Sequence, residues 1–140
     1  MQAMSLLTDL FIASPNEIKS LNSDILPHHF KVLEARRIDT IKIAALDEIL
    51  TGEGQEITEP IRASEDYEWA IFHIRPELRN ALARLSSYER RRIALKWSQA
   101  QEWQLDGGTA EDLAQWLEEA GSLANQAEKE SKEIYIRISL

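Results

Sequence analysis

The chain has 140 residues, contains no cysteine and carries a formal net charge of -8. This length suffices for one domain with its own core, and the absence of cysteine excludes disulfide bonds, cysteine-based zinc sites and thiolate nucleophiles. The apolar run near the N-terminus, LFIA, is far shorter than the core of a signal peptide or a membrane span. We therefore expect one cytoplasmic domain covering residues 1–140, without membrane contact.

The first predicted elements are a strand and a short helix. Residues 8–13, TDLFIA, predict a strand. In the following SPNE, Ser14 can cap a helix, Pro15 suits the first helical position, and Glu17 can reach back to the cap. This capping box predicts a helix from Pro15 to about Asn22.

The next predicted elements are two helices separated by a loop and a strand. Residues 40–50 predict a helix that ends before a glycine, and residues 51–66, TGEGQEITEPIRASED, predict a long polar loop. YEWAIFHI at 67–74 predicts a second strand. Pro76 then begins a helix, PELRNALARL, whose leucines recur at helical spacing.

The segment 86–105 predicts a long helix, which begins with a second capping box formed by Ser86 and Glu89. The helix is expected to be central and to contact neighbours on two sides. The glycines of DGG at 106–108 then allow the chain to turn back. The apolar residues fall on two sides of this helix, Ile93, Trp97 and Ala100 on one and Tyr88 and Leu95 on the other.

The last two predicted elements are a helix over 110–132 and a C-terminal strand. The apolar residues of the helix fall within an arc of about 140°, on one face. Glu111, Glu118 and Glu119 lie outside that arc and are expected to face solvent. EIYIRISL at 133–140 alternates apolar and polar residues, which indicates a strand with one buried face.

Together these elements predict an α+β fold that is predominantly helical. About five helices are expected to pack on one face of a small antiparallel sheet that includes the C-terminal strand. The last two helices should form an antiparallel hairpin with Trp97 and Trp116 in its core. Trp69 and Trp103 lie at the margins of their apolar faces, where tryptophans either anchor partners or pack at the rim of the core.

A basic segment interrupts the acidic chain. Residues 71–105 contain 7 basic and 3 acidic residues. The consecutive arginines at 90–92 fan around a helix, whereas Arg92, Lys96 and Trp103 share one side. Such a stripe can stack a base and neutralise phosphate, but the net charge of -8 opposes nucleic-acid binding. We predict no nucleic-acid binding and expect the stripe to pair with acids of the following helix, Asp112, Glu119 and Glu130.

The sequence contains no recognisable catalytic, metal or cofactor motif. His28 and His29 are adjacent and point to opposite sides of an extended chain, and no HxxxH or HExxH spacing occurs. His73 lies in an apolar run and is expected to be a core or edge histidine with a satisfied ring nitrogen. Clustered carboxylates lie in polar stretches, and phosphate-binding loops and a GxSxG turn are absent. We predict no metal site, no cofactor and no catalytic residue.

The leading functional hypothesis is a non-enzymatic protein-interaction module with a regulatory or neutralising role. Its acidic surface, which includes Glu111, Glu118 and Glu119, would bind a basic protein partner. Trp69 and Trp103 would contribute anchors to such a surface. No feature of the sequence sets the oligomeric state.

The alternative hypothesis is a small-molecule-binding protein or an enzyme. Its pocket would lie beside the loop at 51–66 and would be lined by Trp69, His73 and one acid. That acid would be Glu65, Asp66 or Glu68.

Overall fold

The computed structural model describes residues 7–21, 30–54, 57, 59–66, 68–104 and 106–139. Its strands are β1 (Leu7–Ala13), β2 (Val32–Arg36), β3 (Arg62–Ala63), β4 (Trp69–Ile74) and β5 (Glu133–Ser139). They form one antiparallel sheet in the order β2-β1-β5-β4-β3. The C-terminal strand β5 therefore lies in the middle of the sheet, between β1 and β4.

The helices are α1 (Pro15–Lys19), α2 (Thr40–Thr51), α3 (Pro76–Ala83), α4 (Ser87–Ser98), α5 (Gln101–Gln104) and α6 (Ala110–Glu130). All predicted helices are present, one of them in two pieces, and the predicted α+β fold is confirmed. Both predicted capping boxes form, at the starts of α1 and α4. Gly52 at the end of α2 and Gly107 before α6 have φ of 81° and 69°, a conformation that favours glycine.

Two strands of the sheet are not among the predicted ones. β2 is short, and its partly buried Leu33 and Ala35 alternate with exposed residues around a central glutamate, so its apolar alternation is too brief to indicate a strand. β3 lies inside the segment 51–66, which the sequence predicts as a loop, and its two residues pair with β4. Both strands depend on a neighbouring strand for their conformation.

The predicted helix 86–105 is wrong in its continuity, because α4 ends at Ser98 and α5 begins at Gln101. On an unbroken helix, residues 97 and 103 would point about 120° apart. The break instead places the Trp103 ring edge-to-face with Trp97, with centroids 5.5 Å apart. Tertiary packing of two large rings therefore decides where this helix is interrupted.

The predicted hairpin is confirmed, and α6 packs on α4 through its tryptophans. Trp97 is 0% exposed and Trp116 is 5% exposed, and their ring centroids lie 5.5 Å apart. α4 contacts both α6 and α2, but the expectation that Tyr88 and Leu95 face a neighbour is wrong, because they are 76% and 53% exposed. α4 buries one side only and presents the other to solvent.

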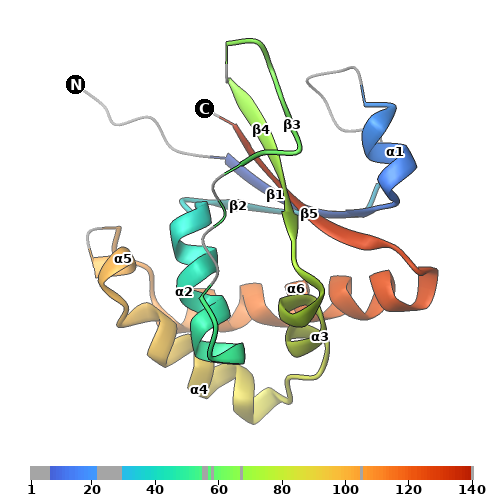
Figure 1. The fold of residues 1–140 in the computed structure, drawn as a ribbon. Helices are drawn as coiled ribbons and strands as arrows, with labels where there is room; N and C mark the ends of the chain where they lie inside the picture. Colours follow the sequence, from blue (N-terminus) through green and yellow to red (C-terminus); the bar gives the residue numbers. More distant parts are fainter. Residues whose placement is uncertain are drawn as a thin grey trace.

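The sheet carries apolar side chains on both faces. Leu10, Ile134 and Ile136 belong to the large core under the helices, whereas Phe11 and Tyr135 belong to a second cluster. Figure 1 shows α1 on one side of the sheet and α2, α3, α4 and α6 on the other. The expectation of a sheet covered on one face is therefore incomplete. The second cluster consists of Phe11, Ala13, Ile18, Leu21, Phe30, Trp69, Ile71 and Tyr135.

Candidate functional site

The solvent side of α6 carries three of the predicted site residues. Glu111, Glu118 and Glu119 are all exposed, as the helical spacing predicts, and we call them the α6 acidic face. The opposite side of α6 is buried because its apolar residues recur at helical spacing against α3, α4 and the sheet. The packing of the apolar side of α6 therefore turns the α6 acidic face toward solvent.

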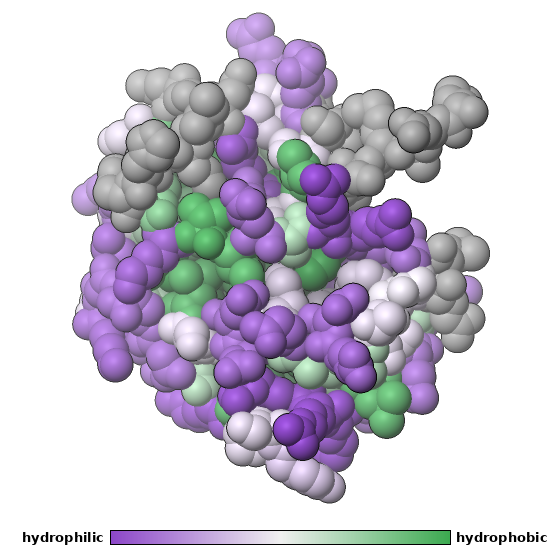
Figure 2. Space-filling model, turned by 180° about the vertical axis from the view of Figure 1, so that it is seen from behind, coloured by the Kyte–Doolittle hydropathy of each residue, from purple (hydrophilic) through white to green (hydrophobic). Residues whose placement is uncertain are grey.

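A groove runs between the acidic face and strand β2. The β2–α6 groove has a volume of about 730 Å³ and is lined on the strand side by Lys31, Val32 and Leu33. Val32 is 38% exposed, although it is apolar. Figure 2, which views this side of the molecule, shows an apolar patch among hydrophilic side chains. The residues of α6 that line the groove are Gln115, Glu118, Glu119, Ser122, Leu123, Asn125, Gln126 and Lys129.

A second hollow lies on the other flank of α6, against the start of α4. The α4–α6 hollow has a volume of about 640 Å³ and is lined by Arg90 and Arg91 of α4. Glu111 lines it from α6, and Gln115 and Glu118 line both this hollow and the β2–α6 groove. The two depressions therefore adjoin along α6 and form one continuous surface.

The charges on this surface alternate across the helix. Arg90 and Arg91 border the acidic face on one flank, and Lys31 borders it on the other. The surface is therefore an acidic centre between basic flanks, and not the uniformly acidic patch that the net charge of -8 suggests.

The predicted basic stripe does not form. Arg92 and Lys96 are exposed on α4, but Trp103 is buried and does not share their side. Neither cation makes an ion pair with Asp112, Glu119 or Glu130 in the described part of the chain. The prediction of these pairs is wrong because α4 packs on α6 through its buried side, Ile93, Ala94 and Trp97, whereas Arg92 and Lys96 lie on its exposed side.

Trp69 and His73 of the alternative hypothesis lie on the same face of β4, four residues apart in the strand. Trp69 is only 8% exposed and sits in the second cluster, with the Arg137 guanidinium 5.5 Å from its ring centroid. The Nε2 atom of His73 lies 3.1 Å from a carboxylate oxygen of Glu133, and its ring packs on Tyr135. The expectation of an edge histidine with a satisfied nitrogen is confirmed.

The three acids proposed beside Trp69 and His73 are exposed in the turn between β3 and β4. Asp66 accepts a hydrogen bond from the Glu68 backbone at 3.3 Å. Hydrogen bonds from the Ser64 hydroxyl and from this backbone amide lower the pKa of Asp66. These contacts stabilise the turn. The acids are Glu65, Asp66 and Glu68.

Trp103 does not lie at a margin, because it is 4% exposed and belongs to the large core. The Nζ atom of Lys42 lies 4.2 Å from its ring centroid, and the same ammonium donates hydrogen bonds to the Asp106 carboxylate and the Arg37 carbonyl. Lys42 is itself 2% exposed. A buried cation and a buried ring therefore hold α2 against the segment that follows α5.

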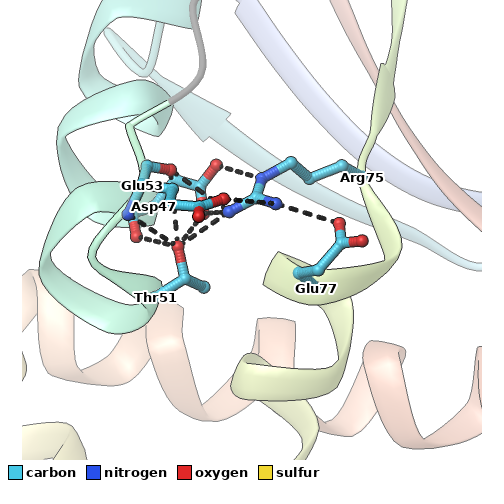
Figure 3. Close-up of polar contacts among 5 residues, drawn as sticks. All are labelled: Asp47, Thr51, Glu53, Arg75 and Glu77. Atoms are coloured by element: carbon cyan, nitrogen blue, oxygen red, sulfur yellow. Dashed lines mark hydrogen bonds and ion pairs between the residues drawn. The ribbon is translucent and has the colours of Figure 1, made fainter.

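A second buried charge joins α2 to the start of α3. The Asp47 carboxylate is 3% exposed and accepts two hydrogen bonds from the Arg75 guanidinium, at 2.6 and 2.9 Å. Thr51 Oγ1 donates to Asp47 at 2.8 Å and accepts from Arg75 at 2.7 Å. Figure 3 shows this network completed by Glu53 and Glu77.

Sequence reasoning misses this network, although one signal for Asp47 is present. Asp47 follows Ile43 and Leu46 on the buried side of α2, so an acid stands where the helical pattern expects an apolar residue. Its partner Arg75 lies 28 residues away, and only the fold brings the two together. Because every polar group of the pair has a partner, the network joins α2 to the start of α3 and leaves no group free for chemistry.

His28 and His29 lie outside the described residues. Within the described ranges, no group of three or more His, Asp or Glu side chains could hold a metal ion. In that same part of the chain, no helix combines the length and the hydrophobicity needed to cross a bilayer.

The chain was compared with protein families, curated proteins and solved structures. No family model, curated protein or solved structure matches the chain.

Proposed function

We propose that the chain is a non-enzymatic, cytoplasmic protein-interaction module that binds a basic partner through α6. The observation that carries the proposal is the position of the α6 acidic face between two adjoining depressions, the β2–α6 groove and the α4–α6 hollow. Exposed carboxylates that line a concave surface can contact basic side chains of a partner that enter it.

The alternating charges favour a partner with a matching pattern. A basic row on the partner would face Glu111 and Glu118, while acidic residues beside that row would face Arg90 or Lys31. Like-charge contacts in any other register cost free energy, so the flanking cations contribute specificity more than affinity. Charge of this kind acts mainly on the association rate.

The sizes of the two depressions suit contact with protruding side chains. Volumes of about 730 and 640 Å³ fall in the range of roughly 300–1,000 Å³ typical of ligand pockets. The apolar Val32 and Leu123 in the β2–α6 groove can bury the stems of long basic side chains.

The proposal is tested by comparing two triple variants as baits in the native cytosol. One changes the α6 acidic face, Glu111→Gln, Glu118→Gln and Glu119→Gln. The matched control changes three exposed acids elsewhere, Glu59→Gln, Glu65→Gln and Glu68→Gln, and alters the net charge equally. We expect a specific basic protein to be recovered with the wild type and the control but lost with the α6 variant.

The purified partner then allows a quantitative test. The α6 variant should associate more slowly and with a weaker dependence on salt, because fewer charges steer the encounter. Equal recovery with all three baits contradicts the proposal. Equal loss with both triple variants also contradicts it, because net charge rather than the α6 surface would then govern binding.

A further inference from the structure

Strand β2 forms one edge of the sheet. It pairs with β1 on one side, and in the described sheet no strand pairs with its other side. An edge strand presents a row of unpaired N–H and C=O groups, which can template a further strand. Its alternating exposure, with Glu34 and Arg36 both exposed, leaves these side chains accessible.

Near this edge two carboxylates are neighbours across the sheet, and the cation opposite Asp9, Arg137 of β5, lies on the side away from Glu34. Glu34 lies directly opposite Asp9 of β1, so two carboxylates meet on one face of the sheet. Burial raises the pKa of Asp9, Arg137 lowers it, and Glu34 raises it. Like charges directly opposite each other destabilise a sheet, and a cation on the open side of Glu34 would offset that repulsion.

The strand itself carries such a cation two residues further along. When two antiparallel copies of Glu34-Ala35-Arg36 pair about Ala35, each Glu34 faces Arg36 of the second copy. The contact occurs twice because a two-fold interface is self-complementary. Pairing about Glu34 would instead oppose the two glutamates, so charge selects the register.

We infer that a second copy of this chain pairs with the outer edge of β2, antiparallel and centred on Ala35. The contact uses Glu34, Ala35 and Arg36 of β2, whereas the proposed partner site uses α6 together with Lys31, Val32 and Leu33 at the start of the same strand. It is short, because Arg37 follows β2 with a φ of 66° and ends the strand. The dimer therefore belongs to the class of small interfaces and dissociates readily.

The inference is tested by sedimentation equilibrium on four samples, at up to about 1 mM protein as befits a small interface. These are the wild type, Glu34→Arg, Arg36→Glu, and an equimolar mixture of the two variants. We expect the wild type to dimerise and each variant alone to lose association by about tenfold or more, because both ionic contacts become repulsive. The mixture should dimerise again, because each arginine-rich strand then faces a glutamate-rich one.

Two further charge reversals control for net charge. Arg92→Glu and Glu68→Arg change exposed residues outside β2, and both should dimerise like the wild type. Three results would overturn the inference: a monomeric wild type throughout the concentration range, single β2 variants that still dimerise, or a mixture that stays monomeric. Recovery of the dimer in the mixture also demonstrates that both variants are folded. Binding to a basic partner through α6 is measured separately and does not depend on this result.

Discussion

Asp47 and Glu118 are both helical carboxylates, yet the structure treats them in opposite ways. Asp47 is 3% exposed and is held by two hydrogen bonds from Arg75. Glu118 is exposed and lines two adjoining depressions on α6. Removing one partner of a buried pair leaves the other charge buried without compensation, which costs stability. Removing an exposed charge costs little, because water already solvates the groups around it.

The difference divides the charged residues of the chain into two groups. In the first group, the buried Asp47 pairs with Arg75 and the buried Lys42 pairs with the partly exposed Asp106, so that α2 is joined to the start of α3 and to the turn after α5. The second group is the exposed acids on α6. They contribute little to the stability of the fold, so a role in binding does not conflict with folding. Substitutions can separate the two groups experimentally.

The largest loss is expected from the buried side of the same helix that carries the acidic face. Trp116→Ala should lower the free energy of unfolding by about 3–5 kcal/mol, because it empties a large site in the core. Urea unfolding measures this loss. A loss below about 1 kcal/mol would contradict the packing of Trp116 against Trp97.

The next loss is expected from the buried ion pair. Asp47→Ala should cost about 3 kcal/mol, at the lower end for such pairs, because Thr51 and Glu77 still contact the Arg75 guanidinium. A double-mutant cycle with Arg75→Met checks the cause. If the two single losses simply add, Asp47 and Arg75 are not coupled.

A smaller loss is expected at Lys42. Lys42→Met keeps the stem that packs on Trp103 and removes the ammonium, and it should cost about 1 kcal/mol. The cost is modest because the Asp106 side chain is 40% exposed and can regain water. A calorimetric or urea-based loss as large as that of Asp47→Ala would mean that Asp106 depends on this partner.

A pH-dependent effect of opposite sign is expected at Asp9. Its pKa is raised by burial, so ionisation of Asp9 disfavours the folded state once the pH exceeds that pKa. Asp9→Asn should therefore stabilise the protein at pH 7 and have no such effect below the normal aspartate range near 3.8. Unfolding at both pH values measures the difference. If the variant is less stable than the wild type at pH 7, the attraction of Arg137 for the Asp9 carboxylate outweighs the cost of burying it.

The smallest effect on stability is expected from the α6 acidic face. Replacing Glu111, Glu118 and Glu119 by Gln should change the free energy of unfolding by less than about 1 kcal/mol, because all three are exposed. Thermal and urea unfolding should nearly superimpose on the wild type. A clear loss of stability would mean that these acids stabilise the fold, as Asp47 and Lys42 do, and are not reserved for binding.

Local signals in the sequence predict the helix starts and the hairpin. Ser14 with Glu17 and Ser86 with Glu89 form capping boxes within four consecutive residues, so no distant contact is needed to recognise them. The spacing along α6 likewise predicts which side is buried and which side carries the acids. The exposure of the acidic face was therefore predictable.

Other features lie beyond such signals because they depend on residues far apart in the chain. The depressions beside α6 exist only because β2 and the start of α4 lie on its two flanks. Burial of Trp103 depends on Trp97 and on Lys42, which comes from another helix. The sequence places Trp103 at the margin of an apolar face only if the helix 86–105 is straight. The packing of the core interrupts that helix after Ser98.

The sequence by itself determined the elements whose causes are local, namely capped helices, an amphipathic α6 and an alternating C-terminal strand. Only the tertiary structure decided the edge strand β2, the break after α4 and the Asp47–Arg75 pair. The physical reason is the range of the interactions. A cap or a helical face is set within a few residues, whereas a buried charge or a strand edge is set by whichever distant segment packs beside it.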